Sequence, residues 1–254
     1  MLTSLAVHFL PSLVSPDELA GGNVVMIDVL RASTTITHAL AAGAAAVVPC
    51  RELDEARTTA ASFPPGAVVL GGERGGLPIE GFDLGNSPTE YTRATVAGKT
   101  VVFSTTNGTL ALMQCTAAAR VLVGGFVNLS AVVQRLTGER PIHLLCAGTR
   151  GRITREDVLC AGAIGELLLE AVVDETRIND QVRIAADCWR AAVPHGARVP
   201  ESLAGELSLA LRETQGVRNL MAIGLEHDID IAAEVDRFDL VPELDIAAWR
   251  IVVA

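Results

Sequence analysis

Lysine, aromatic residues and paired cysteines are scarce in this sequence. Lys99 is the only lysine among 20 lysine and arginine residues, whereas 30 acidic residues give the 254-residue chain a formal net charge of −10. An acidic chain lacks the basic surface that nonspecific nucleic-acid binding requires, so we expect no nucleic-acid partner. Aromatic residues make up only 4% of a chain that is 50% hydrophobic. The core should therefore consist mainly of aliphatic side chains, as in buried parallel strands and closely packed helices.

Cysteine spacing and the length of hydrophobic runs exclude further classes. The five cysteines are scattered without a CxxC pair, which argues against a structural zinc site or a disulfide scaffold. No run of about 18 apolar residues is free of charge, glycine and proline, so we expect no membrane span. Residues 1–22 lack the basic start of a signal peptide and are interrupted by prolines and acids. We therefore expect a cytoplasmic protein.

Short apolar runs, each followed by a polar or glycine-rich loop, alternate with helical stretches. We expect strands at residues 23–29, 44–49, 67–71, 100–104, 120–124 and 141–146. This alternation predicts an α/β fold with three layers, α/β/α, and a largely parallel, possibly mixed sheet.

Helical patterns dominate the chain after about residue 150. We expect helices at 156–171, 180–192 and 201–224, the last broken at Gly216, followed by edge or closing strands at 228–233 and 245–253. No linker marks a boundary, so one domain over residues 1–254 is the simplest prediction, and a separate helical C-terminal subdomain is the alternative. The acidic residues between 228 and 239 do not match a calcium loop, and we interpret them as a solvated face.

The loop at residues 27–35 (IDVLRASTT) contains the first candidate site residues. Ligands of open α/β sheets bind at the carboxyl ends of strands, and Asp28 stands at such an end. A buried carboxylate there requires a cation, a metal or a backbone donor. Arg31 can grip a phosphate or sulfonate, and Thr34 can donate to an anion. A helix N-cap with a structural Asp–Arg pair is the alternative interpretation.

The glycine-rich loop at residues 71–88 follows another strand and holds Glu73, Arg74, Asp83 and Asn86. Its glycines indicate a close approach of backbone to some group. Glu73 leaves a strand end as Asp28 does, and two converging acids would form an oxygen site suited to Mg²⁺. A structural surface loop is the alternative.

Two further loops complete the candidate site. Residues 104–109 (STTNGT) offer hydroxyl, amide and backbone N–H groups, which is the composition of an anion cradle, although the P-loop pattern is absent. Residues 146–158 contain Arg150, a candidate anion ligand, and Asp157. Thr154 as a helix N-cap with Asp157 in the first turn is the structural alternative.

In sequence order, IDVLRAST, GGERGG, GFDLGNSP, TTNGT, GGFVNLSA and REDVLCAG resemble motifs of the 2-phosphosulfolactate phosphatase family of magnesium-dependent hydrolases. The resemblance runs over residues 24–170 and is extended by RNL, DID and VP at 218–242. It implies hydrolysis of the phosphate ester of 2-phospho-3-sulfolactate to sulfolactate and phosphate, with Mg²⁺ as cofactor. In methanogens this step belongs to coenzyme M biosynthesis.

The loops and the resemblance together define the candidate residues. The catalytic candidates are Asp28, Glu73, Asn107 and Asp157; the substrate-binding candidates are Arg31, Thr34, Arg74, Asn86, Thr105, Thr106, Gly108 and Arg150; the metal ligands are Asp28, Glu73 and Asp83. Asp28 invites comparison with the aspartyl nucleophile of haloacid dehalogenase-type phosphatases, but Leu30 stands where those enzymes have their acid/base Asp. We therefore prefer attack by a metal-activated water.

Two other functions stay open from the sequence. The protein could hydrolyse a different small organophosphate acid, or it could be a noncatalytic anion-binding module on the same fold. The clustered acids beside anion donors argue against a module that only binds. A homodimer is expected from the general frequency of symmetric assemblies.

Overall fold

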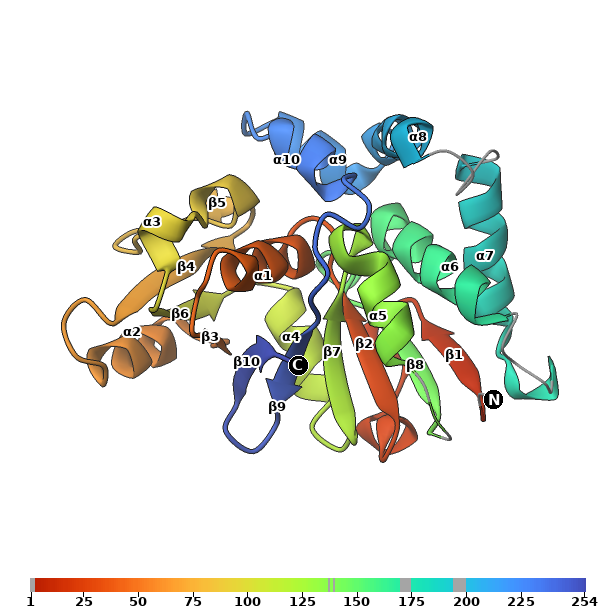
Figure 1. Ribbon diagram of the computed structural model, residues 1–254, viewed down its shortest axis with the longest axis horizontal. Helices are drawn as coiled ribbons and strands as arrows, with labels where there is room; N and C mark the ends of the chain where they lie inside the picture. The colour runs from red at the N-terminus through yellow and green to blue at the C-terminus, as the bar shows by residue number, and fades with distance from the viewer. Residues whose placement is uncertain (1–2, 137, 139, 170–174, 194–199) are drawn as a thin grey trace.

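A ten-stranded sheet with helices on both faces forms the body of the protein (Figure 1). The computed structural model describes residues 3–136, 138, 140–169, 175–193 and 200–254. The strand order is β1-β8-β2-β7-β9-β10-β3-β6-β4-β5. The sheet is mixed but mostly parallel, which confirms the predicted α/β fold class.

The strands lie close to the predicted runs. They are β1 (Leu5–His8), β2 (Asn23–Ile27), β3 (Ala46–Pro49), β4 (Val68–Arg74), β5 (Leu77–Pro78), β6 (Thr100–Ser104), β7 (Arg120–Gly124), β8 (Ile142–Cys146), β9 (Pro242–Asp245) and β10 (Arg250–Val253). The α-helices are α1 (Ala32–Ala41), α2 (Leu53–Ala61), α3 (Arg93–Val96), α4 (Gly108–Gln114), α5 (Leu129–Arg135), α6 (Arg155–Leu169), α7 (Asp180–Ala192), α8 (Pro200–Arg212), α9 (Gln215–Met221) and α10 (His227–Ala232). Short 3-10 turns include η3 (Pro88–Glu90) and η4 (Phe126–Asn128).

The hairpin of β9 and β10 lies in the middle of the sheet. It separates the parallel group β1-β8-β2-β7 from the parallel group β3-β6-β4 and is antiparallel to both neighbours. Figure 1 shows β4 and β6 lying across the direction of β2 and β7, as expected for a strongly twisted sheet. The twist brings the carboxyl ends of both groups to one region.

Three sequence predictions near the C-terminal end need correction. Residues 228–233 form most of α10 instead of a strand, because Asp228, Ile229 and Ala232 are buried with helical spacing. The strand expected at 245–253 is present as β10, but it lies at the centre of the sheet. The helix break expected at Gly216 lies earlier, where the Thr214 side chain accepts a hydrogen bond from Val217 N–H and caps α9.

Strand β2 shows how the three layers are held together. All five of its residues are buried. Val25 and Ile27 face a core shared with α5, α6 and α7, whereas Val24 and Met26 face a core shared with α1 and α4. Because a strand covered on both faces has apolar residues at successive positions, its sequence shows no alternation of apolar and polar residues.

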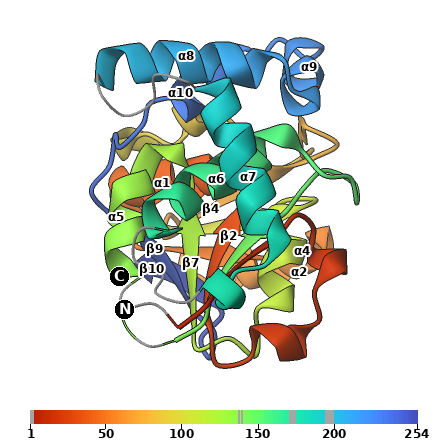
Figure 2. The same ribbon diagram turned by 90° about the vertical axis from the view of Figure 1, so that its right-hand side faces the viewer.

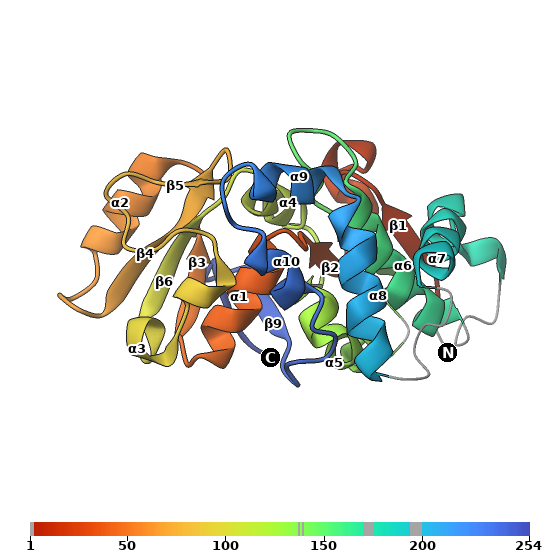
Figure 3. The same cartoon turned by 90° about the horizontal axis from the view of Figure 1, so that it is seen from above.

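Helices α8, α9 and α10 lie above the carboxyl end of β2 (Figures 1 and 3). Figure 2 shows α6 and α7 side by side below α8; both helices contact β1, and α6 also contacts β8. Within the described ranges, no helix combines the length and the apolar character that crossing a bilayer requires.

Candidate functional site

A cavity of about 230 Å³ lies where the strand ends meet the C-terminal helices. Its size suits a small molecule rather than a polymer. Predicted residues from all four strand-end loops line it: Asp28, Arg31, Glu73, Asn86, Thr106, Asn107 and Arg150. From the other side it is lined by Gly216, Asn219, Leu220 and Ala222. We call the strand-end loops the floor and residues 215–232, which include α9 and α10, the roof.

Asp28 follows the last residue of β2 and is 6% exposed. Its Oδ1 accepts a hydrogen bond from Ala32 N–H at 3.3 Å, which is a long contact for a buried carboxylate. Gly108 allows α4 to approach, since a Cβ there would lie 2.9 Å from Asp28 Oδ2. Burial, with the nearby carboxylates of Asp157 and Glu73, raises the pKa of Asp28 well above its usual range. A bound cation would favour the charged form.

Glu73 ties two loops of the floor together. Its Oε1 accepts a hydrogen bond from Thr106 N–H and its Oε2 accepts one from Gly76 N–H, both at 2.7 Å. These bonds fix the 104–109 loop against the turn that follows β4. Each carboxylate oxygen can accept a further bond, so Glu73 can position the loops and still contact a ligand.

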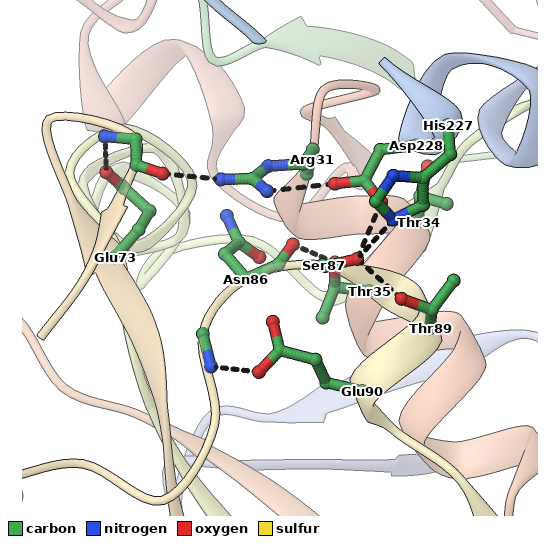
Figure 4. Close-up of polar contacts among 12 residues, drawn as sticks. Arg31, Thr34, Thr35, Glu73, Asn86, Ser87, Thr89, Glu90, His227 and Asp228 are labelled. Atoms are coloured by element: carbon green, nitrogen blue, oxygen red, sulfur yellow. Dashed lines mark hydrogen bonds and ion pairs between the residues drawn. The ribbon is translucent and has the colours of Figure 1, made fainter. Parts of the chain in front are cut away.

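Arg31 is the N-cap residue of α1 and is 4% exposed. Its Nη1 donates to Asp228 Oδ2 and its Nη2 donates to the Gly76 carbonyl, both at 2.9 Å (Figure 4). The structural Asp–Arg pair considered from the sequence therefore exists, but its acid is Asp228 instead of Asp28. Since the guanidinium also lines the cavity, the pair does not exclude contact with a ligand.

Asn86 lies beside Arg31 at the cavity and is 6% exposed (Figure 4). Its backbone carbonyl accepts a hydrogen bond from Thr35 Oγ1 at 2.9 Å. The side-chain Oδ1 is buried and has no hydrogen-bond partner among the described residues. A buried amide oxygen without a donor is costly, so this atom is available to a cation or a ligand donor.

Arg150 is the exposed cation of the floor. Its backbone is in the left-handed region, with φ 52°, and its N–H donates to Asn107 Oδ1 at 2.9 Å. Within the part of the chain that the structure describes, its guanidinium forms no hydrogen bond. The full donor set of Arg150 is thus free for a second anionic group.

Arg74 and Asp83 do not reach the cavity. Arg74 donates to the Glu73 carbonyl and to Ser104 Oγ, both at 2.8 Å. Successive strand residues point to opposite faces, so Glu73 and Arg74 cannot both point into the cavity. Asp83 is exposed and its Oδ2 accepts a hydrogen bond from Leu70 N–H at 2.8 Å. The prediction that Asp83 joins the other two acids as a metal ligand is therefore wrong.

Thr34, Thr105 and Asp157 are buried behind the cavity surface. Thr34 Oγ1 donates to the Val29 carbonyl at 2.9 Å, and the Thr105 hydroxyl pairs with Thr109 at 3.2 Å. Both hydroxyls are used inside the fold, so the structure does not place them as ligands of a substrate.

Asp157 joins the ends of β2 and β8 to the start of α6. Its Oδ1 accepts a hydrogen bond from Val29 N–H, and its Oδ2 accepts bonds from Gly148 N–H and Thr154 Oγ1, all at 2.9 Å. Burial raises the pKa of Asp157 against the effect of these bonds. Thr154 and Asp157 are thus in contact through a hydroxyl-to-carboxylate hydrogen bond, and Asp157 positions the floor from below.

Two buried acids that the sequence interpretation did not place in the site contact residues of the cavity lining from behind. Asp228 is fully buried although it was assigned to a solvated face, and the helical spacing of Asp228, Ile229 and Ala232 could have revealed it. Glu156 is 1% exposed, and its Oε2 has no partner among the described atoms. Gly216 of α9 packs on it so closely that a Cβ there would lie 2.0 Å from Glu156 Oε1.

Candidate metal ligands at the cavity are few. Over the described ranges, no group of three or more His, Cys, Asp and Glu side chains could hold a metal ion. The carboxylates that line the cavity are those of Asp28 and Glu73, and the unpartnered Oδ1 of Asn86 is a third candidate oxygen ligand. Magnesium commonly uses one or two protein carboxylates, with waters and substrate oxygens completing its shell.

Comparison with known proteins gives a consistent result over most of the chain. The sequence model of the family described as 2-phosphosulpholactate phosphatase matches residues 8–246. A protein of Prochlorococcus marinus strain MIT 9313, named probable 2-phosphosulfolactate phosphatase, is 40% identical over 223 residues, covering 86% of this chain and 87% of its own. Proteins of the same name from Deinococcus radiodurans and Caldanaerobacter subterraneus are 37% and 36% identical over 243 and 232 residues, covering at least 91% of each chain. The chain belongs to the 2-phosphosulfolactate phosphatase family.

Proposed function

We propose that the protein is a magnesium-dependent phosphatase that hydrolyses 2-phospho-3-sulfolactate to 3-sulfolactate and inorganic phosphate. The observation that carries the proposal is one cavity that combines the buried carboxylate of Asp28 with the guanidinium groups of Arg31 and Arg150. The family membership and the names of the relatives support this choice of ester.

The oxygen atoms of the floor fit Mg²⁺. Asp28, Glu73 and the Asn86 Oδ1 would hold the ion, and two acids with an amide oxygen are the hard donors that it prefers. Two features support this assignment: Asn86 Oδ1 has no partner, and burial with Asp157 and Glu73 raises the pKa of Asp28, so that a cation would satisfy the first and favour the charged form of the second. When bound, Mg²⁺ supplies charge neutralisation and Lewis acidity to the transferring phosphoryl group.

Different side chains of the cavity would bind the phosphate and the other anionic groups of the substrate. Phosphoryl transfer depends mainly on positioning and on neutralising the charge of the transferring group. Arg31 and the Thr106 side chain would contact phosphate oxygens on the floor, while Glu73 keeps Thr106 in place through its backbone N–H. The free guanidinium of Arg150 would bind the sulfonate or carboxylate.

We propose water as the attacking nucleophile. Leu30 lines the cavity next to Asp28, so the proton donor that aspartyl-phosphate chemistry uses two residues after its nucleophile is absent at that position. Trapping a phospho-adduct or a beryllofluoride adduct on the Asp28 carboxylate would overturn this mechanism without affecting the substrate assignment.

The test is a set of phosphate esters assayed for phosphate release with added Mg²⁺ and with EDTA. We expect 2-phospho-3-sulfolactate to be hydrolysed fastest, phospholactate and phosphoglycerate more slowly, and none of them in EDTA. Faster hydrolysis of another ester would replace the substrate. Binding of these anions without any hydrolysis would instead support a noncatalytic binding module.

A further inference from the structure

One acid of the roof lies deeper than any other acid of that segment. Asp228, the second residue of α10, is 0% exposed, whereas Asp230 on the same helix is exposed and pairs with Arg212 at 2.8 Å. The two aspartates share a helix and a charge but differ in environment. Only Asp228 contacts a residue of the cavity.

Asp228 uses both carboxylate oxygens. Oδ2 accepts the 2.9 Å hydrogen bond from Arg31 Nη1, and Oδ1 accepts one from Ser87 Oγ at 2.6 Å (Figure 4). His227 Nε2 lies 3.1 Å from the same Oδ1, and Ser87 Oγ pairs further with Thr89 Oγ1 at 2.8 Å. These contacts fix the orientation in which the Asp228 carboxylate faces Arg31.

Arg31 is held from two sides. Asp228 accepts from Nη1, and the Gly76 carbonyl, whose turn is fixed by Glu73, accepts from Nη2. A guanidinium has five donors in one plane, so two bonds to the protein fix its plane and leave donors for a ligand. In Figure 4, Arg31 spans the gap between Glu73 and Asp228, with Asn86 beside it.

Stability alone is a weak explanation for this buried pair. Apolar side chains of similar volume often replace a buried ion pair without loss, because desolvation offsets the Coulomb attraction. An arginine that must present donors to an anion cannot be replaced in that way. Without Asp228, Arg31 keeps its charge but loses one of the two contacts that orient it.

We propose that Asp228 is a positioning residue of the active site, which orients the Arg31 guanidinium toward an anionic oxygen of the phosphate ester. The inference rests on the proposed function and assigns the roof a part in it. Asp228 itself contacts Arg31 and the roof-side hydroxyls, and it acts on the substrate only through Arg31.

The experiment compares Asp228→Asn with Asp230→Asn in the full-length protein. Because Arg31 loses one of the two bonds that orient it, and bonds to charged groups are among the strong ones, we expect Asp228→Asn to raise the KM for 2-phospho-3-sulfolactate about 30-fold. Its inorganic phosphate affinity, measured by titration calorimetry, should fall by a similar factor, and kcat should change less. Asp230→Asn should stay within about twofold on every readout.

A double variant separates positioning from a general structural effect. In an Arg31→Lys background the oriented guanidinium is absent, so adding Asp228→Asn should change KM by less than about twofold. A full 30-fold effect in that background would overturn the proposal. A folded Asp228→Asn protein with wild-type KM and phosphate affinity would also overturn it.

Two outcomes need separate treatment. If Asp228→Asn does not fold, Ser87→Ala decides, because it removes the bond to Asp228 Oδ1 and leaves the bond from Arg31 to Oδ2 in place. A KM increase of about threefold supports the proposal and an unchanged KM overturns it. If the wild-type protein binds inorganic phosphate but hydrolyses no ester, the proposed function fails. The role of Asp228 is then tested by comparing the phosphate affinities of the wild type and Asp228→Asn. If it does neither, both proposals fail.

Discussion

The floor and the roof of the cavity are built in different ways. The floor consists of loops fixed by short hydrogen bonds, such as those from Thr106 and Gly76 to Glu73, at the ends of largely buried strands. The roof consists of two short helices, α9 and α10, and its contacts with the floor include the hydrogen bonds of Asp228 with Arg31 and Ser87 and the packing of Gly216 against Glu156. The chemistry is therefore expected on the rigid side, and substrate affinity is expected to depend on both.

The largest effect should come from the floor. Asp28→Asn removes the carboxylate that faces the cavity, and we expect kcat to fall by about 10³-fold, as for other groups that stabilise transition-state charge. The assay is Mg²⁺-dependent phosphate release, with circular dichroism as a check of folding. Asp83→Asn is the matched control, because Asp83 is exposed and outside the cavity. Equal losses in both variants would mean that the floor is wrongly assigned.

A substitution in the roof should have a smaller effect on activity. Gly216→Ala places a Cβ against the buried Glu156 carboxylate and forces α9 away from the floor. We expect KM to rise about 10-fold, with a loss of about 1–3 kcal/mol in unfolding free energy typical of overpacking. Gly205→Ala in α8, where the new Cβ meets no atom within 4 Å, should leave KM unchanged. An unchanged KM for Gly216→Ala would mean that α9 is not needed for substrate binding.

Arg150→Gln tests the edge of the floor. We expect the KM for 2-phospho-3-sulfolactate to rise about 10-fold, a value reduced by the solvent exposure of Arg150. Phospholactate, which lacks the sulfonate, should be affected less. Arg152→Gln is the control, because Arg152 is exposed and lies outside the cavity lining. An equal rise in KM for both esters would show that Arg150 does not contact the sulfonate.

The contact between floor and roof should also respond to pH. Burial, with Asp157, raises the pKa of Glu156 to about 7, so the folded state binds this proton more tightly than the unfolded state. The resulting stability is fully present below the unfolded value near 4.5 and is lost as pH rises through about 7. Glu156→Gln should therefore raise the unfolding free energy by at most about 3 kcal/mol at pH 8 and much less at pH 5.

Denaturant unfolding at both pH values, in EDTA, measures this difference. Glu80→Gln removes an exposed acid from the chain and should shift stability equally at both pH values. If the unfolding free energy of Glu156→Gln has the same pH dependence as that of the wild type, ionisation of Glu156 does not destabilise the folded state.

The sequence predicted the floor well because strand ends are local features. The runs at 100–104 and 120–124 correspond to β6 and β7, and each of the four loops contributes to the cavity. It was harder to predict which side chains of a strand point toward the cavity. Strand alternation separates Glu73 from Arg74, and both had been placed in the site. Asp83 and Thr34 were misjudged because a polar residue in a site loop can equally bond its own backbone.

The roof could not be derived in the same way. Asp228 is separated from Arg31 by 197 positions, and no local pattern indicates which arginine a helical aspartate will meet. Its acidic neighbours suggested a solvated face, and only the apolar spacing within α10 indicates burial on one side. The central position of β9 and β10 was likewise invisible, because strand order depends on pairing across the whole chain.

The position of that hairpin has a consequence for how the protein is made. The strands β7 and β3, which border it, are synthesised more than 100 residues before β9 and β10 emerge from the ribosome. Until then each presents an unpaired backbone edge of the kind that invites pairing with another chain. The last strands in sequence therefore join the two halves of the sheet, and the complete sheet can form only after residues 242–253 have been made.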